Sequence, residues 1–325
     1  MKGKKLYWQI PLLVLLIVGT VFITCREHAP YQRCQGFVFG TMYNISYQHS
    51  SDLQDEIEVA LKQVDGEFSM FNENSTVAAV NRGEQPELSN AYKEVYALAQ
   101  SVNKETDGAF DITVAPLVNA WGFGFKNEQL PTKEQVDSLL QVRSQLDFSA
   151  IAKGYGCDVV ARLLQDKGIE NYLVEIGGEV VAGGVNDSGK PWRIGVSKPI
   201  EGADMSADEL QAVLTVSNQA LATSGNYRNF YVTDDGKKYA HTIDPRTGYP
   251  VQHNILSATV LAPDCATADA YATSFMVLGL DSALTVLNRH TELQAYFIYT
   301  DSLGHYATWH SPKMKVETID VEATE

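Results

Sequence analysis

The order in which helical and strand patterns follow one another constrains the fold of this chain most strongly. Between residues 52 and 167, apolar residues recur at helical spacing, as Leu53, Ile57 and Leu61 do. From residue 172 onward, short apolar runs are separated by Gly, Asn, Asp and Pro, which is typical of strands joined by tight turns. Helices and strands therefore cluster separately rather than alternating. This order predicts an α+β fold with largely antiparallel sheets packed against helices.

The same patterns predict the individual elements. We expect helices over residues 52–66, 88–106, 132–142, 149–167 and 267–278. We expect strands over residues 37–48, with Gly40 as a bulge, and over 172–176, 180–184, 192–196, 212–216, 221–224, 229–232, 255–261 and 293–300.

Size and charge exclude several classes of function. The 325 residues suffice for one large domain or two modest ones, and 45% hydrophobic with 20% charged residues describes an ordinary globular protein. A net charge of −15 argues against nucleic-acid binding, which needs clustered Lys and Arg. An anionic substrate would need a local lysine, backbone N–H groups or a cation to offset this charge.

The N-terminus has the pattern of an export signal. Lys2, Lys4 and Lys5 precede an apolar run over residues 10–23, which is followed by Cys25. Cys25 could be lipidated after cleavage, or the run could remain as an uncleaved signal anchor. Both alternatives place the rest of the chain outside the cytoplasm and hold it at a membrane. We therefore expect a signal peptide or anchor over 1–24, a tethering linker over 25–36, the folded domain over 37–315 and an acidic tail over 316–325.

Three further cysteines follow no recognisable spacing. Export would permit a disulfide between Cys157 and Cys265, but we expect these residues and Cys34 to be small buried thiols. No Cys/His cluster with zinc-ligand spacing occurs in the sequence, so a structural zinc is not expected.

The segment from Ser149 to Gly156 reads as a phosphate-binding helix start. It combines a capping serine, a lysine and two glycines, and a helix N-terminus presents free N–H groups to an anion. Lys153 could contact a phosphate as a point charge or lie on the surface. Gly154 and Gly156 each cost about 1 kcal/mol relative to Ala inside a helix. Close approach of a ligand to the backbone would explain them.

Asp269 and Thr273 lie four residues apart, which places both on one face of a helix. A carboxylate and a hydroxyl are hard oxygen donors suited to Mg²⁺. The alternative is that Asp269 interacts favourably with the helix dipole and Thr273 is merely packed.

Three other positions could contribute to a site. His241 precedes a turn fixed by Pro245 and Gly248, and its imidazole suits a general base near neutral pH. The Gly177-Gly178 pair is either a tight turn or a ligand contact. Asp111 could accept hydrogen bonds from a base or ribose, or cap its local turn.

Together these segments resemble the ApbE family, the FAD:protein FMN transferases. No single motif is specific, but their joint order over residues 40–279 is. Glu175 departs from the pattern, because asparagine is common before the Gly-Gly pair in the family. The matching segments are 40–42, 68–71, 110–114, 150–154, 176–178, 224–227, 241–248 and 268–273.

The resemblance implies an ApbE-like (T-fold-like) architecture and an activity. Such an enzyme uses Mg²⁺ to split FAD, transfers FMN to a threonine or serine of a partner protein and releases AMP. Asp269, Thr273 and the carbonyl of Ala150 would bind the metal, and His241 would be the base. The FAD site would be lined by Met42, Met70, Phe71, Asp111, Lys153 and Ile243.

The resemblance also implies partners and a location. The acceptors in this family are subunits of sodium-pumping quinone reductases or Rnf-type complexes. A tethered enzyme on the periplasmic side of the bacterial inner membrane would face them. Two alternatives remain open from the sequence: an Mg²⁺-dependent FAD pyrophosphatase, and an exported flavin-binding lipoprotein without catalysis.

Overall fold

The computed structural model describes residues 11, 13–15, 29–124, 130–142, 144–199, 210–226, 230–232, 238–252 and 254–319. Most of the expected signal segment, together with Cys25 and Tyr227, lies outside these ranges. Within them, no helix is both long enough and apolar enough to cross a bilayer.

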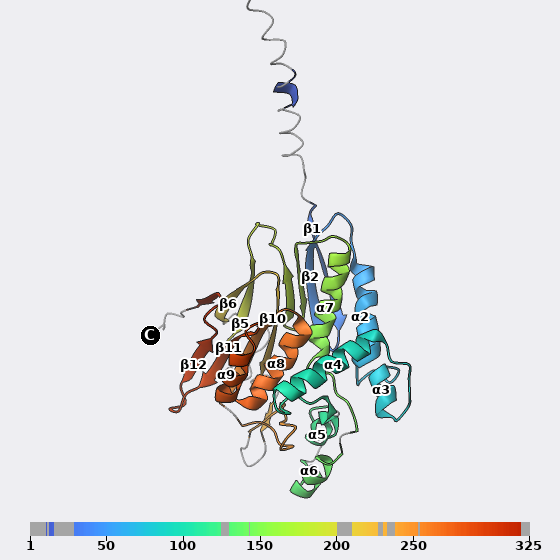
Figure 1. The fold of residues 1–325 in the computed structure, drawn as a ribbon, viewed down its shortest axis with the longest axis vertical. Helices are drawn as coiled ribbons and strands as arrows, with labels where there is room; N and C mark the ends of the chain where they lie inside the picture. Colours follow the sequence, from blue (N-terminus) through green and yellow to red (C-terminus); the bar gives the residue numbers. More distant parts are fainter. Residues whose placement is uncertain are drawn as a thin grey trace, which may run out of the picture.

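An eight-stranded, entirely antiparallel sheet forms the centre of the molecule (Figure 1). The α+β prediction is therefore confirmed. In spatial order the strands are β1 (Tyr31–Val38), β2 (Thr41–Gln48), β3 (Tyr172–Ile176), β4 (Glu179–Gly183), β7 (Gln219–Gly225), β10 (Ile255–Ala262), β11 (Gln294–Thr300) and β12 (Tyr306–His310).

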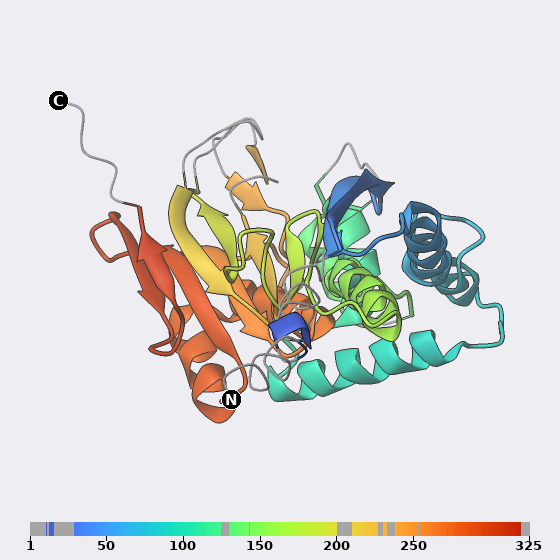
Figure 2. The ribbon, with the colours of Figure 1, turned by 90° about the horizontal axis from the view of Figure 1, so that it is seen from above.

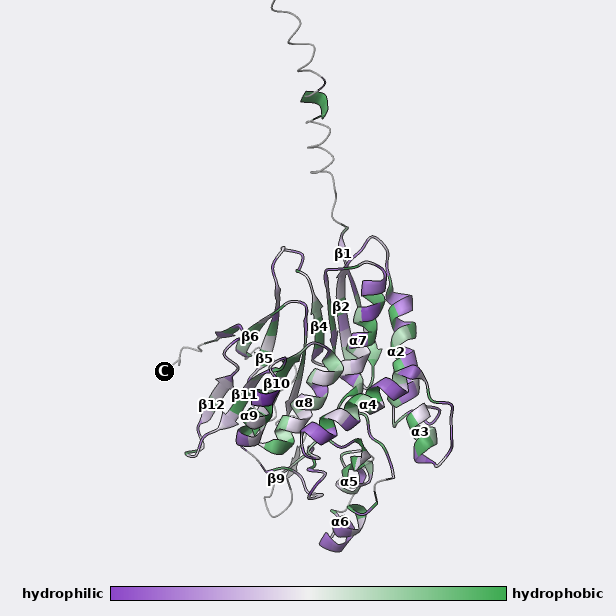
Figure 3. Ribbon diagram, in the orientation of Figure 1, coloured by the Kyte–Doolittle hydropathy of each residue, from purple (hydrophilic) through white to green (hydrophobic). Residues whose placement is uncertain are grey.

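Helices cover one face of this sheet (Figures 1 and 2). Along α2, hydrophobic and hydrophilic residues alternate around the helix (Figure 3), and its buried side chains are Ile57, Leu61, Val64 and Phe68. Burying such side chains contributes roughly 1.5–3 kcal/mol each, which is what fixes the helices on the sheet. The covering helices are α2 (Gln54–Phe68), α4 (Asn90–Glu105), α7 (Ala152–Asp166), α8 (Cys265–Leu278) and α9 (Leu280–Arg289).

A second, smaller sheet packs on the opposite face. It consists of β13 (Val316–Thr318), β6 (Leu210–Val216) and β5 (Trp192–Ser197). Trp192 and Leu214 from this sheet share a core cluster with Leu221 and Tyr296 from the large one. The short strands β8 (Phe230–Val232) and β9 (Lys238–Ala240) form a separate hairpin.

Short helices gather at one end of the large sheet. In Figure 1, α5 (Ala115–Ala120) and α6 (Lys133–Leu139) lie beyond the end of the sheet, below α4 and α8. The 3-10 helix η1 (Ile112–Val114) leads into α5, and α3 (Thr76–Asn81) follows α2. This end of the molecule contains the candidate site.

The prediction of one bulged strand over 37–48 is wrong. The chain reverses at Phe39 and Gly40, whose φ angles are +52° and +74°, and β1 pairs with β2 as a hairpin. Both turn residues have the left-handed conformation that two-residue hairpin loops require. This turn is difficult to predict from the sequence because Phe rarely adopts the left-handed conformation.

Both expected boundaries of the domain also shift. Residues 31–36 lie within the predicted tether, but they pair with β2 as part of β1. Residues 316–318 lie within the predicted tail, but they pair with β6 as β13. The folded part therefore extends beyond the predicted range 37–315 at both ends.

Candidate active site

One cavity of about 860 Å³ opens at the end of the sheet where the short helices gather. It lies among the start of α7, the β3–β4 turn, β5, β7, α8 and the loop that follows β9. All but one of the side chains expected in the site line it: Met70, Phe71, Asp111, Ala150, Lys153, His241, Ile243, Asp269 and Thr273.

Met42 is the exception among the described residues. Its side chain, on β2, is 51% exposed and is not part of the cavity wall. Met42 reaches the wall only through its backbone, because its carbonyl accepts a hydrogen bond of 3.0 Å from the N–H of Gly177. This contact supports the turn that lines the cavity.

The start of α7 differs from the expected phosphate cradle. The helix begins at Ala152, its N-cap is Ile151, and no side chain caps it, so the prediction of Ser149 as the cap is wrong. The N–H groups of Ile151 and Ala152 donate to the carbonyl of Phe148. A turn in the chain therefore uses two of the backbone N–H groups that the sequence predicts to be free for an anion.

Gly154 serves helix packing rather than ligand approach. A Cβ at this position would overlap the backbone carbonyl of Cys265 at the start of α8. Similarly, a Cβ on Gly156 would come within 2.6 Å of the Phe39 ring. The two glycines let α7 lie directly against α8 and the β1–β2 turn.

Asp269 and Thr273 project from α8 into the cavity, as their four-residue spacing predicts. Asp269 is only 3% exposed, and its Oδ2 accepts a hydrogen bond of 3.1 Å from the N–H of Gly154. Burial raises the pKa of Asp269, while Lys153 and the Gly154 N–H act in the opposite direction. The Oγ1 of Thr273 lies 3.0 Å from the hydroxyl of Ser224 on β7.

Glu179 is a site residue that sequence reasoning missed. It is the first residue of β4, it lines the cavity at 2% exposure, and its Oε1 lies 2.5 Å from Nζ of Lys153. Burial raises the pKa of Glu179, and Lys153 partly offsets this shift. Its position directly after Gly177-Gly178 was the available signal.

The Gly177-Gly178 pair is both a turn and part of the wall. Both glycines have positive φ angles, +64° and +106°, which the tight β3–β4 connection requires. Glu175, which stands where asparagine is expected, stabilises this turn through hydrogen bonds of its carboxylate. Its Oε1 accepts a bond of 2.8 Å from the N–H of Gly178, and its Oε2 accepts one of 2.7 Å from Asn44.

His241 starts a loop that is fixed by its own turn. The N–H of Gly248 donates to the carbonyl of Asp244, and the guanidinium of Arg246 donates to both carboxylate oxygens of Asp244. Trp121 donates from its indole to the carbonyl of Gly248 at 2.8 Å. Half-buried at the start of this loop, His241 lines the cavity together with Ile243.

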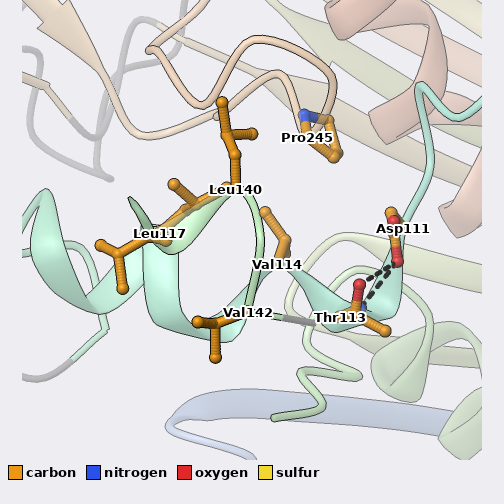
Figure 4. Close-up of a pocket in the computed structure, with 8 residues that line it drawn as sticks. Asp111, Thr113, Val114, Leu117, Leu140, Val142 and Pro245 are labelled. Carbon is orange, nitrogen blue, oxygen red and sulfur yellow. Dashed lines mark hydrogen bonds between the residues drawn. The ribbon is translucent and has the colours of Figure 1, made fainter. Parts of the chain in front are cut away.

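Asp111 caps its local turn, one of the two alternatives left open by the sequence. Its Oδ1 accepts from the N–H and the hydroxyl of Thr113 at 2.8 and 2.7 Å (Figure 4). Besides the main cavity, Asp111 lines a hollow of only about 10 Å³ with Val114, Leu117 and Pro245. That hollow has room for about one water molecule, which excludes it as a substrate site.

The described cysteines are free thiols. Cys34, Cys157 and Cys265 are all buried, as expected, and the last two lie beside the contact between α7 and α8. The described residues contain no group of three or more His, Cys, Asp or Glu side chains arranged to hold a metal. A cation at this cavity would instead depend on one carboxylate with hydroxyl and carbonyl oxygens.

Comparison with known proteins decides the family. The sequence model of the ApbE family matches residues 39–297, most of this chain. The chain belongs to the ApbE family. Two relatives named FAD:protein FMN transferase are similar over nearly their whole length. The relative from Haemophilus influenzae is 35% identical, and the match covers 89% of this chain and 93% of the relative. The relative from Escherichia coli K12 is 34% identical, and the match covers 93% of this chain and 96% of the relative.

Solved structures of the ApbE family share the fold. The flavin transferase ApbE from Vibrio cholerae superposes with a TM-score of 0.78 at 34% identity, covering 87% of this chain and 98% of its own. The flavinyl transferase ApbE from Pseudomonas stutzeri, in its apo form, superposes with a TM-score of 0.76 at 30% identity. The match covers 88% of this chain and 96% of that structure. The expected ApbE-like architecture is therefore confirmed.

Proposed function

We propose that this chain is an Mg²⁺-dependent FAD:protein FMN transferase. It moves FMN from FAD onto a threonine or serine hydroxyl of a subunit in a membrane redox complex, such as a sodium-pumping quinone reductase or an Rnf-type complex, and releases AMP. The observation that carries the proposal is that His241, Lys153, Asp269 and Thr273 line one cavity. Relatives with this activity in their name, alike over most of the chain, support it.

The cavity suits a dinucleotide. Its volume of about 860 Å³ falls within the range of small-molecule sites. Met70, Phe71 and Ile243 give part of the wall an apolar character that fits a flavin ring. Lys153 places a cation on the wall, where it would offset the charge of a diphosphate.

The residues of the cavity fit a magnesium ion. Asp269, Thr273 and the carbonyl of Ala150 are hard oxygen donors on one wall, and the carboxylate of Asp269 is directed there by its bond to Gly154. When bound, Mg²⁺ would neutralise the diphosphate and stabilise the AMP leaving group. Asp269 would remain ionised beside the cation despite its burial.

His241 supplies the base. A threonine hydroxyl is a poor nucleophile until its proton is removed, and the imidazole of His241 would accept that proton. The hydroxyl oxygen forms a bond to the FMN phosphorus, the bond from that phosphorus to the bridging oxygen breaks, and the oxygen leaves with AMP. The fixed 241–248 turn would hold the imidazole in place during this step.

We infer the site of action from the N-terminal sequence. We place the enzyme on the periplasmic side of the bacterial inner membrane, held by a lipid at Cys25 or by an uncleaved anchor over residues 1–24. Acceptor subunits whose modified domains face the same side would meet it there.

Product analysis tests this proposal. The protein is incubated with FAD and Mg²⁺, with and without an acceptor domain, and the acceptor is then analysed by mass spectrometry. We expect an FMN adduct on a hydroxyl residue and one AMP per adduct. Free FMN and AMP with an unmodified acceptor would indicate a pyrophosphatase instead. Unchanged FAD in both samples would indicate a flavin-binding protein without catalysis.

A further inference from the structure

Glu179 presents a physical problem that the proposed chemistry does not explain. Its carboxylate is 2% exposed, and although Oε1 pairs with Lys153, Oε2 has no hydrogen-bond partner among the described residues. Removing such a charge from water costs several kcal/mol, which one ion pair rarely recovers. Fold stability alone therefore gives no reason to keep a carboxylate at this position.

Two buried carboxylates from different elements act on the charge of Lys153. Burial lowers the pKa of Lys153, but Glu179 on β4 and, more weakly, Asp269 on α8 raise it, and the net shift is upward. The next residue along α7, Gly154, donates its backbone N–H to Asp269. The flexible four-carbon stem of Lys153 therefore starts beside Asp269, although its ammonium is bound to Glu179.

With Asp269 as a cation ligand, the ammonium of Lys153 and the divalent cation would compete for the same carboxylate. An ammonium paired with Asp269 would occupy an oxygen donor that the cation needs, and it would add like-charge repulsion at the site. The ion pair with Glu179 removes the ammonium from that position while keeping it on the cavity wall.

We propose that Glu179 is a positioning residue: it holds the ammonium of Lys153 against β4 and thereby keeps it off Asp269, which remains open to a divalent cation. This inference rests on the proposed function only in taking Asp269 as a cation ligand. Glu179 acts through Lys153 and needs no contact with the reacting atoms.

Binding of Mn²⁺ to the full chain, followed by electron paramagnetic resonance without FAD, tests the inference. Glu179→Gln should weaken Mn²⁺ binding about tenfold, because the released ammonium turns to Asp269. Lys153→Met should bind Mn²⁺ at least as tightly as the wild type. Glu179→Gln combined with Lys153→Met should bind within about threefold of Lys153→Met alone, since no ammonium remains to compete.

The double variant separates this role from the alternatives. If it binds as weakly as Glu179→Gln, Glu179 is itself a ligand and the inference is wrong. Unchanged binding in Glu179→Gln, with normal binding in the wild type, contradicts the inference alone. Wild-type Mn²⁺ binding that does not depend on Asp269 contradicts the metal assignment itself.

A second variant tests the inference if Glu179→Gln does not fold. Glu179→Asp keeps the charge but withdraws it by one methylene, so it should weaken Mn²⁺ binding in the same direction by a smaller factor. Thermal melting of each variant confirms that the compared proteins are folded. Tighter Mn²⁺ binding in Glu179→Asp than in the wild type would overturn the inference.

Discussion

The α7–α8 wall and the loop over residues 241–251 line the same cavity, but they hold their polar groups by different means. On the α7–α8 wall, Asp269 is buried and bonded to Gly154, and the carboxylate of Asp158 accepts the N–H groups of Cys265 and Ala266 at 2.8 Å each. These contacts join two core helices, so this wall is part of the fold.

The loop is held by hydrogen bonds within itself and by packing of Ile243 against Leu117 and Val136 from the short helices. Asp244 bonds to Arg246 and to the backbone of Gly248, and Trp121, the residue that follows α5, adds one bond. His241 lies at one end of this structure, half-buried. Substitutions on the α7–α8 wall should therefore change stability and function together, whereas removal of the imidazole should change function alone.

The largest effect is expected for Asp269→Asn. It keeps an oxygen that can accept the Gly154 N–H but removes the charge that would bind the cation. Loss of metal catalysis should lower Mg²⁺-dependent AMP release at least about 1,000-fold. Asp269→Ala should show the same loss of rate and, in addition, a lower melting temperature. AMP release from Asp269→Asn at a near-normal rate would remove the metal assignment.

His241→Ala should have the next largest effect, and on function only. Loss of the base should slow FMN transfer roughly 100-fold, as is typical for general base catalysis. The dissociation constant for FAD, measured by fluorescence, and the melting temperature should stay close to wild type. A comparable loss of FAD affinity would instead make this residue a substrate contact.

Gly154→Ala tests the close contact of the two helices. The added methyl group overlaps the Cys265 carbonyl, so the helices must separate, at a cost of about 2 kcal/mol in the free energy of unfolding. Gly66→Ala is the matched control, because its helical position in α2 has open space around a Cβ. It should stabilise the protein by about 0.5–1 kcal/mol. Equal effects in urea denaturation would contradict the packing role of Gly154.

The smallest effect concerns pH. Burial raises the pKa of Asp158 from 3.8 to about 7, although the N–H groups of Cys265 and Ala266 oppose the shift. The folded protein then holds this proton more tightly than the unfolded chain, so the stabilisation is complete below pH 3.8 and is lost as pH rises through about 7. The melting temperature of metal-free protein should fall across this range.

Two variants isolate the contribution of Asp158. The fall in melting temperature with pH should be shallower in Asp158→Asn. It should be unchanged in Asp281→Asn, which alters an exposed acidic residue on α9. The same slope in Asp158→Asn as in the wild type would show that this carboxylate is ionised equally in both states.

Much of the helical half was predictable from the sequence, because its signals are local. The apolar spacing of Ile57 and Leu61 marked α2 to within two residues at each end, and the spacing of Asp269 and Thr273 placed both on one wall. Helical periodicity in the sequence shows which side chains share one face of a helix, and in the folded protein the apolar face is the buried one.

What the sequence could not provide depends on partners distant along the chain. The sequence predicts a ligand contact at Gly154, because nothing in the sequence shows that Cys265, on another helix, lies against it. Glu179 is not among the site residues predicted from the sequence, since nothing local indicates that Lys153 will pair with it. The misread turn at Phe39 likewise hid the pairing of β1 with β2.

Locating the cation tests the central claim most directly. A crystal of the slow His241→Ala variant with FAD and Mn²⁺, examined by anomalous scattering, would show where the metal lies. The account predicts one peak coordinated by the Asp269 carboxylate and the Thr273 hydroxyl, in contact with the FAD diphosphate. A peak away from α8, or FAD bound with its diphosphate on another wall, would contradict it.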